Sequence, residues 1–197
     1  MASKINIIKA VAARLGEEVP QSLNDDVDVM IALDAIYNSV VEEAITSKIG
    51  WQFATRTVTL TATANTPTAP WKTEYSRPNG LLGISDVLDE YGTSIDYELS
   101  ESVIYSNRYS DQALTLVYTF WPDEALWPGD FAGAVEEELF GRALGAFDEL
   151  IRSLEIRQIA EDKFKKAFRR QMRQRPPQRF NTSPLLRAWF GRVSRRY

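Results

Sequence analysis

Apolar residues recur at helical spacing in two separate regions of the chain, one at each end. In the first region, Ser3 precedes a short amphipathic pattern that Gly16 and Pro20 interrupt, which predicts a capped helix over residues 3–15. A second pattern starts near Asn24, and its apolar stripe continues to Ile45. The sequence therefore predicts two consecutive helices before residue 50.

The middle of the chain has a different pattern of apolar and polar residues. Residues 53–63 alternate β-branched and polar side chains, which is typical of a strand. Further short strands are predicted at Lys72–Tyr75, Leu82–Leu88, Ile95–Leu99, Val103–Tyr105 and Leu114–Phe120. Turn residues such as Asn79-Gly80 and Gly92 separate them. The pattern indicates a small antiparallel β region.

Helical spacing returns after Pro128-Gly129-Asp130. An apolar stripe runs from Phe131 to Leu154, and around Ile156 the chain either bends or continues into a helix with a basic outer face. Pro176 ends the pattern. We expect an α+β protein in which residues 1–52 and 121–175 form an antiparallel helical bundle, residues 53–120 form an inserted β subdomain, and residues 176–197 form a basic tail.

Composition narrows the chemistry that this fold can carry. The 197 residues include no cysteine and no histidine, which excludes disulfides, Cys–His and Ser–His–Asp catalysis, and zinc sites built on these ligands. We expect no metal, no cofactor and no enzymatic activity. There is no signal-peptide pattern and no apolar run long enough to span a membrane, so the sequence predicts an intracellular protein.

Carboxylates are the remaining candidates for catalysis. Glu136, Glu137 and Glu138 lie together on the third predicted helix, and Asp148 and Glu149 follow on the same helix. Pairs of carboxylates serve glycoside hydrolysis when they lie roughly 5–10 Å apart. We interpret these residues instead as a solvated acidic helix face, and a carboxylate-dependent hydrolase stays the weaker alternative.

Charge is distributed very unevenly along the chain. Residues 1–150 contain 9 Lys and Arg against 24 Asp and Glu, a net charge of −15, whereas residues 151–197 contain 14 against 3, a net charge of +11. Such asymmetry is typical of a basic segment that meets a polyanion or an acidic protein surface.

The basic tail also carries large apolar side chains. The residues that we expect to contact a partner are Arg179, Phe180, Leu185, Leu186, Arg187, Trp189, Phe190 and Arg192. Nucleic acid is one candidate partner and an acidic protein surface is another, while a solubilising end is the plainest interpretation. Adjacent tryptophan and phenylalanine are poorly explained by solubility, so we favour a protein partner.

Two glycines interrupt the third predicted helix. Gly141 and Gly145 lie four residues apart, and each costs about 1 kcal/mol of helix stability relative to alanine. A close approach by another helix would offset this cost. The partner helix belongs either to the same bundle or to another subunit, and the sequence leaves both open.

Four short stretches occur in an order that resembles the head-to-tail adaptor proteins of tailed phages, of the tail tubular protein A type. They are Ala35-Ile36-Tyr37 leading to Gly50-Trp51-Gln52-Phe53-Ala54, Tyr75–Ile84, Val117–Asp123, and Trp127-Pro128-Gly129-Asp130-Phe131. With the acidic helix start that precedes the first stretch and the long Ala-, Leu- and Phe-rich helix that follows the last, the resemblance covers roughly residues 25–175.

The resemblance implies a structural virion protein without catalytic activity. Members of this family form a ring of about twelve subunits that binds the portal protein and a downstream tail protein, and the genome DNA passes through it. It implies location in the virion neck, and in the host cytoplasm during assembly, without a membrane partner. On this interpretation the tail binds the portal, and the subunits pack through Trp121, Trp127, Phe131, Gly141 and Gly145.

Overall fold

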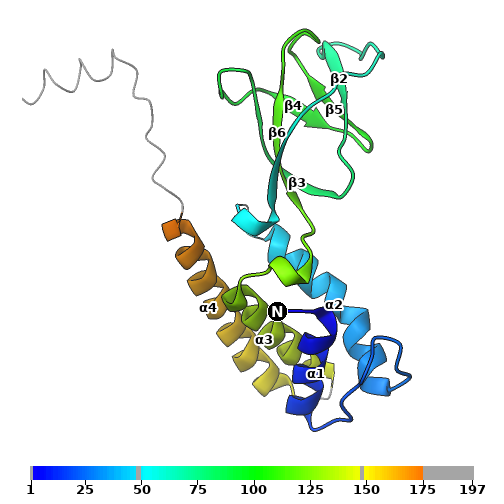
Figure 1. Cartoon of the computed structure of the whole chain (residues 1–197), viewed down its shortest axis with the longest axis vertical. Helices are drawn as coiled ribbons and strands as arrows, with labels where there is room; N and C mark the ends of the chain where they lie inside the picture. Colours follow the sequence, from blue (N-terminus) through cyan, green and yellow to red (C-terminus); the bar gives the residue numbers. More distant parts are fainter. Residues whose placement is uncertain (1, 48–49, 147–148, 175–197) are drawn as a thin grey trace, which may run out of the picture.

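The chain is an α+β protein with a helical part and a β part, as the sequence predicts. We describe it from a computed structural model, which covers residues 2–47, 50–146 and 149–174. Figure 1 shows the β part projecting from one end of the helical part. The helices are α1 (Lys4–Leu15), α2 (Asp28–Thr46), α3 (Gly129–Ala146) and α4 (Leu150–Gln174), with short 3₁₀ turns at Gln52–Ala54 and Glu124–Leu126.

The first helix forms where the sequence predicts it. The Ser3 hydroxyl accepts a hydrogen bond from the Asn6 N–H at 3.3 Å, and Gly16 ends the helix in the left-handed conformation with φ of 79°. The second helix begins at Asp28, later than predicted. Asp25 instead accepts hydrogen bonds from the N–H and hydroxyl of Ser22, so it stabilises the turn before the helix.

The long apolar stripe after Phe131 is divided between two helices. The prediction of one helix from Phe131 to Leu154 is wrong, because α3 ends at Ala146 and α4 starts at Leu150. Of the two alternatives near Ile156, a bend or a continuing helix, the structure has the continuing helix. The two helices lie side by side and antiparallel. Leu150 and Leu154 keep the helical spacing of the stripe, but the chain reversal places them on the surface instead of in the core.

The β part consists of two three-stranded antiparallel sheets. One has the order β1–β6–β3, with β1 (Thr55–Thr59), β6 (Thr115–Phe120) and β3 (Leu81–Leu88). The other has the order β2–β5–β4, with β2 (Thr73–Ser76), β5 (Val103–Ser106) and β4 (Tyr97–Leu99). The predicted strands are found with small shifts at their ends. The first is shorter than predicted, because the 3₁₀ turn occupies residues 52–54 and β1 ends at residue 59.

Each part has its own apolar core. The helical core contains residues from all four helices, and the β core contains residues from β2, β3, β5 and β6, with Val87 and Ile104 fully buried. Trp51 lies in the helical core at the base of the β part. Its ring contacts Phe53, Phe131 and Phe168 at centroid distances of 5.0 to 5.6 Å, so one side chain joins α3, α4 and the entry to β1.

Candidate functional site: the groove and outer surface of α4

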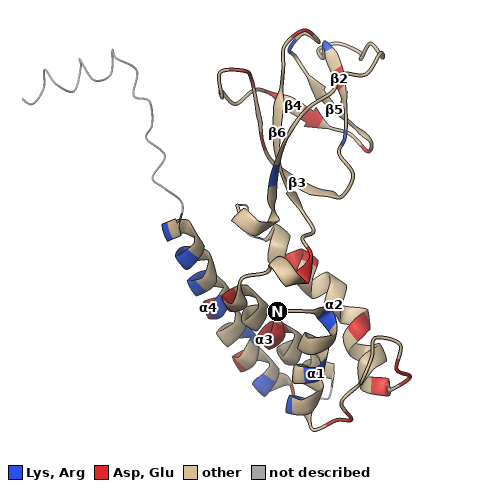
Figure 2. Cartoon of the chain, viewed as in Figure 1, with Lys and Arg blue, Asp and Glu red and all other residues tan. Residues whose placement is uncertain are grey.

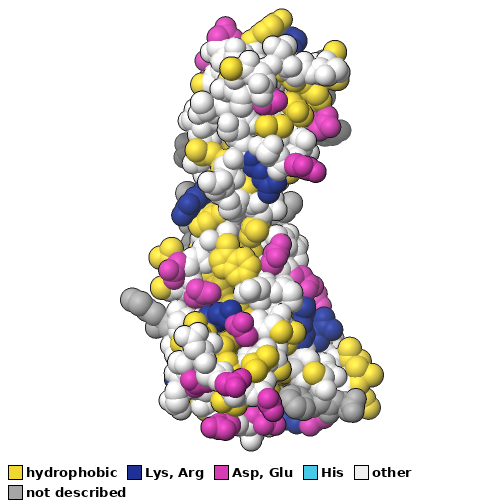
Figure 3. All heavy atoms as spheres, turned by 90° about the vertical axis from the view of Figure 1, so that its right-hand side faces the viewer, with side chains coloured by type: hydrophobic (Ala, Val, Ile, Leu, Met, Phe, Trp, Pro, Cys, Tyr) yellow, Lys and Arg dark blue, Asp and Glu magenta, His cyan; other side chains and the backbone are white. Residues whose placement is uncertain are grey.

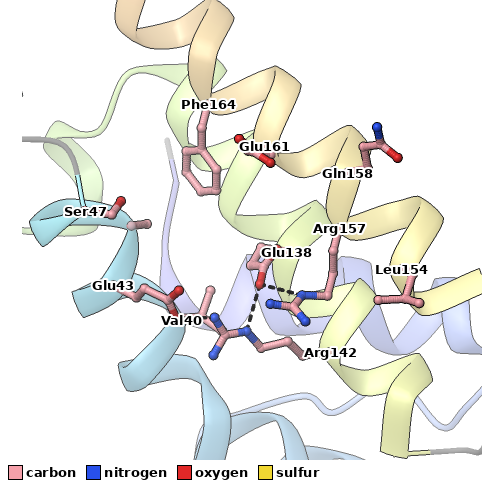
Figure 4. A pocket seen from close by; sticks show the side chains of 11 residues that line it. Val40, Glu43, Ser47, Glu138, Arg142, Leu154, Arg157, Gln158, Glu161 and Phe164 are labelled. Carbon is pink, nitrogen blue, oxygen red and sulfur yellow. Dashed lines mark hydrogen bonds and ion pairs between the residues drawn. The ribbon is translucent and has the colours of Figure 1, made fainter. Parts of the chain in front are cut away.

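A groove of about 570 Å³ lies between α2 and α4, and α3 forms its floor. Its walls and floor include Val40 and Glu43 of α2, Glu138 and Arg142 of α3, and Leu154 and Arg157 of α4. Figure 4 shows the charged side chains converging at the floor, while Phe164 and Val40 lie at the edges. The groove therefore has a charged floor, and its walls mix apolar side chains with polar and charged ones.

The floor of the groove is an ion-pair network centred on Glu138. One of its carboxylate oxygens lies 2.8 Å from Nε of Arg142 and 3.1 Å from Nε of Arg157, and Arg142 also binds Glu43. The Glu138 side chain is only 13% exposed. A carboxylate at this depth needs charged partners, and the two guanidinium groups supply them. The network links α2, α3 and α4.

A second network connects α3 to α1 and α4 on the other side. Arg14 donates to Oε2 of Glu137 at 2.8 Å, and Lys163 donates to Oε1 at 2.6 Å. Burial of the carboxyl raises the pKa of Glu137, but the hydrogen bonds from Arg14 and Lys163 outweigh it and hold this pKa below its ordinary value. Glu137 is thus an ionised link between three helices.

These contacts correct the interpretation of the acidic run as a solvated helix face. Glu137 and Glu138 are largely buried and are bound by cations from other helices. Glu149 pairs with Arg152 at 3.0 Å, and Asp148 lies outside the described residues. Within residues 2–47, 50–146 and 149–174, no group of acidic side chains is arranged to hold a metal ion. The carboxylates that sequence analysis considered for hydrolysis are engaged in helix-to-helix ion pairs.

The start of α4 exposes three large apolar side chains. Leu150, Ile151 and Leu154 are 64%, 78% and 57% exposed, and we call them the α4 patch. Leu154 also forms part of the groove wall (Figure 4). Sequence analysis missed this patch because it assigned the same residues to the core. In the structure Glu149 directly precedes α4, and its carbonyl accepts a hydrogen bond from the Ser153 N–H.

The basic face of α4 is partly neutralised within the chain. Arg157 and Lys163 bind Glu138 and Glu137, and Arg170 binds Asp130 at 2.7 Å. Lys166, Arg169 and Arg173 make no ion pair with any residue that the structure describes. In Figure 2 the ribbon positions of Lys and Arg, in blue, recur toward the C-terminal end of α4. The cations available to an outside partner are therefore concentrated near the C-terminal end of this helix.

The two glycines of α3 face α4 of the same chain. A Cβ on Gly141 would lie 2.6 Å from Cγ of Arg157, and one on Gly145 would lie 3.2 Å from Oγ of Ser153. Ser153 is buried and donates a hydrogen bond to the carbonyl of Gly141 at 2.7 Å. Of the two roles that the sequence leaves open, packing within one chain accounts for both glycines.

The aromatic residues predicted to pack between subunits pack in or against the chain's own core. Phe131 is fully buried and Trp127 is 6% exposed, and their rings contact each other at 5.1 Å. Both rings thus pack within the chain's own core, and their role in subunit packing stays a prediction from sequence. Trp121 is half-buried and packs on the helical core.

The predicted docking residues of the tail lie outside the described residues. They are Arg179, Phe180, Leu185, Leu186, Arg187, Trp189, Phe190 and Arg192. Their role remains a prediction from sequence.

No family model matches this chain, and no curated protein matches it significantly. None of the helices within the described residues is both long enough and apolar enough to cross a membrane.

Proposed function

We propose that the protein is a structural adaptor that forms a ring between the portal and the tail of a phage or phage-like particle. The order of the sequence motifs favours this class. The arrangement it implies, a helical bundle built from both ends of the chain with an inserted β subdomain, is compatible with the α+β architecture. In this proposal the protein has no catalytic role and acts through its contacts with other proteins.

The observation that carries the proposal is the α4 patch. Its three side chains are exposed next to a groove, in a helical part whose core is otherwise well packed. Clusters of exposed apolar side chains on a protein surface often mark sites of protein–protein contact. A protein that works by assembling with copies of itself and with other proteins needs such a surface.

The net charge of −15 over residues 1–150 supports a channel function. DNA phosphates are repelled by an acidic surface, so DNA moves past it without adhering. A ring whose inner wall is formed by residues 1–150 would let the genome pass.

The basic tail is the proposed portal-binding segment. Truncation after Arg175 removes every predicted docking residue and leaves all four helices in place. We expect the truncated protein to keep its circular dichroism spectrum and unfolding temperature but to lose attachment to purified portal rings. Normal attachment of the truncated protein would contradict the docking role.

Two full-length variants separate the contributions of charge and apolar surface. One replaces Leu185, Leu186, Trp189 and Phe190 by serine and keeps the arginines; the other replaces Arg179, Arg187 and Arg192 by glutamine and keeps the apolar residues. We expect the serine variant to lose more affinity for the portal, because buried aromatic side chains dominate interface energetics. A larger loss in the glutamine variant would favour an electrostatic partner such as nucleic acid.

Nucleic-acid binding is the second candidate function, and it is favoured by the cations near the end of α4 that form no ion pair with a described residue. Lys166, Arg169 and Arg173 are available for phosphate contacts. Three such contacts would weaken binding roughly 40-fold between 50 and 200 mM salt, and additional contacts from the tail would steepen this dependence. Affinity for a DNA duplex is measured at both salt concentrations. If no binding is detected, or if the affinity does not change with salt, this function is excluded.

A further inference from the structure

We infer that a shallow groove at the start of α2 binds the chain's own tail, residues 176–197. We call it the acidic groove, and it is distinct from the groove between α2 and α4. The inference gives an occupant to a surface that the proposed function does not use. Only its consequence for the portal rests on the proposed function.

The acidic groove has an apolar lining that is open to solvent. Its volume is about 540 Å³, within the size range of ligand-binding pockets. Leu23 and Ile31 line it and are 48% and 56% exposed, and Ala35, also exposed, follows one turn after Ile31. Val40, which lines the groove between α2 and α4, lies on the opposite side of the helix from Ile31. The acidic groove is thus on the outer face of α2, the face turned away from α4.

Three carboxylates also line the acidic groove, those of Asp25, Asp26 and Asp34. Lys4 pairs with Asp34 at 2.6 Å, whereas Asp25 and Asp26 make no ion pair with any residue that the structure describes. The pKa of Asp25 is held below its ordinary value mainly by a hydrogen bond from the Ser22 hydroxyl and least by the charge of Lys9. Two of the three negative charges therefore have no bound cation among the described residues.

The surface around the acidic groove is acidic as well. Residues 16–47 contain eight acidic residues and neither lysine nor arginine. Figure 3 shows the side of the molecule on which α2 lies, and acidic side chains are interspersed there with hydrophobic ones over the helical part. The exposed acidic residues that make no ion pair with a described residue include Glu17, Glu18, Asp28 and Glu42. A segment that binds here should be basic and should carry large apolar side chains.

The tail has this composition. Residues 176–197 contain five arginines and no acidic residue. Arg187 lies between two pairs of large apolar residues, Leu185-Leu186 and Trp189-Phe190. The arginines are complementary to the carboxylates of the acidic groove, and the apolar pairs are complementary to its lining.

The tail is also long enough to reach the acidic groove. The end of α4 lies next to the residues that follow α2, because a Cβ on Gly50 would lie 3.6 Å from Cε of Met172. The groove is at the other end of α2, whose 19 residues span about 28 Å (Figure 1). The 15 residues from Gln174 to Trp189 extend to about 50 Å. This length covers the span of α2 and the path around it to its outer face.

Covalent linkage favours the chain's own tail over the tail of a second copy. A site within reach of a tethered segment meets that segment at an effective concentration on the order of millimolar. At micromolar protein concentration, the tail of a second copy is about a thousandfold more dilute. Both tails have the same sequence and make the same contacts, so the difference in concentration decides the occupant.

In the proposed function, the portal has to displace the tail from the acidic groove. Ile31→Lys removes an apolar side chain from the groove and adds a charge that repels the arginines, at a position that is more than half exposed. Because its tail is free, this variant should attach to portal rings at least about threefold more tightly than the wild type. Attachment equal to that of the wild type would contradict a tail held by the groove.

Cross-linking tests the contact in the protein alone. The chain has no cysteine, so Ala35→Cys and Ala188→Cys, introduced together in the full-length chain, report on one pair of positions. Under mild oxidation we expect a disulfide within one chain, which mass spectrometry of the proteolysed protein identifies. Covalent dimers as the main product at micromolar concentration would place the tail on a second copy and overturn the inference.

The matched control replaces Ala35→Cys by Ala125→Cys and keeps Ala188→Cys. Ala125 is exposed and lies three residues before Pro128, which lines a pocket together with Gln174 at the end of α4. A tail that met the surface at random would reach this position at least as easily as Ala35. We expect the Ala35 pair to cross-link at least about fivefold faster. Equal rates, or a faster control, would overturn the inference.

A synthetic peptide of residues 176–197 tests whether the groove is occupied. The full-length variant with serine at positions 185, 186, 189 and 190 has a defective tail, so its groove is vacant. It should bind the peptide at least about tenfold more tightly than the wild type, whose own tail competes. Adding Ile31→Lys to this variant should lower its affinity for the peptide at least about tenfold. Equal affinity of the wild type and the serine variant would overturn the inference.

The control for the groove substitution is Ile159→Lys in the same serine variant. Ile159 is 47% exposed and lies on α4, outside the acidic groove, so this change should leave peptide binding unaltered. Equal losses from Ile31→Lys and Ile159→Lys would show that the peptide does not bind in the acidic groove.

The failure of this inference differs from the failure of the proposed function. The cross-linking and peptide experiments contain no portal, so they can succeed with a protein that never attaches to portal rings. Conversely, a wild-type protein that attaches to the portal through its tail, but shows neither the fast cross-link nor the stronger binding of peptide by the serine variant, would retain the proposed function and overturn the inference. We expect both the fast cross-link within one chain and the stronger binding.

Discussion

At the scale of single residues, the absence of a side chain at position 141 brings α3 and α4 into close contact. A Cβ there would lie 2.6 Å from Cγ and 3.3 Å from the backbone nitrogen of Arg157. Arg157 cannot move away without loosening its ion pair with Glu138 on the groove floor. One glycine thus sets the distance between two helices and the position of a groove residue.

Gly141→Ala should destabilise the protein, and Gly133→Ala in the same helix provides the matched control. A Cβ on Gly133 meets no atom within 4 Å, so alanine there should raise the free energy of unfolding by about 1 kcal/mol through helix propensity. At Gly141 the clash should exceed this gain and lower the free energy of unfolding. Urea denaturation measures both, and equal stabilisation by the two substitutions would contradict the close packing of α3 against α4.

Glu137 makes the stability of the helical part depend on pH. Its pKa in the folded protein is below the ordinary value of 4.5, so it stabilises the fold above that pH, and the contribution is lost as the pH falls through the folded pKa. Glu137→Gln should cost roughly 1–2 kcal/mol at pH 7 and less in acid. Glu155→Gln, at an exposed α4 position, should leave the free energy of unfolding unchanged both at pH 7 and in acid. An equal cost of Glu137→Gln at pH 7 and pH 3 would contradict the ionised link.

At the scale of elements, the periodicity of apolar residues predicts the helices and strands well but not where the chain reverses. Ile8, Tyr37 and Phe131 are buried as their spacing predicts. Leu150 and Leu154 continue the same spacing yet lie on the surface, because periodicity cannot show that the helix has ended. The ends of α3 and α4 depend on contacts between helices, which local sequence does not determine.

The two ion-pair networks of α3 were not predictable for a similar reason. Glu137 and Glu138 are adjacent in a run of three acidic residues, which usually indicates a solvated face. Their partners Arg14, Arg157 and Lys163 lie 19 to 123 residues away in the chain. Only the packing of α1 and α4 on either side of α3 brings them together.

Substitution of Trp51 tests how the helices are joined to the entry of the β part. It is 1% exposed, and its indole N–H donates to the carbonyl of Ala44 at 3.0 Å. Trp51→Ala should cost about 3–5 kcal/mol in the free energy of unfolding. Trp71→Ala, at a half-buried position in the β part where the indole donates to Glu98, should cost clearly less. Similar losses from both substitutions would contradict the central position of Trp51.

At the scale of the whole molecule, the two ends of the chain provide surfaces of opposite character. The outer face of α2 is apolar and acidic, whereas α4 is apolar where it starts and basic where it ends. The tail that follows adds six arginines and no acidic residue after Gln174. A molecule with exposed apolar side chains on two helices and a basic tail is suited to assemble with its own copies and to bind a different partner.

The most direct test of the central claim is electron microscopy of the purified full-length protein mixed with purified portal rings. The account predicts closed rings stacked coaxially on the portal, and loss of the stacking when the chain is truncated after Arg175. Isolated monomers that leave the portal rings bare would contradict the claim that this protein is a head-to-tail adaptor.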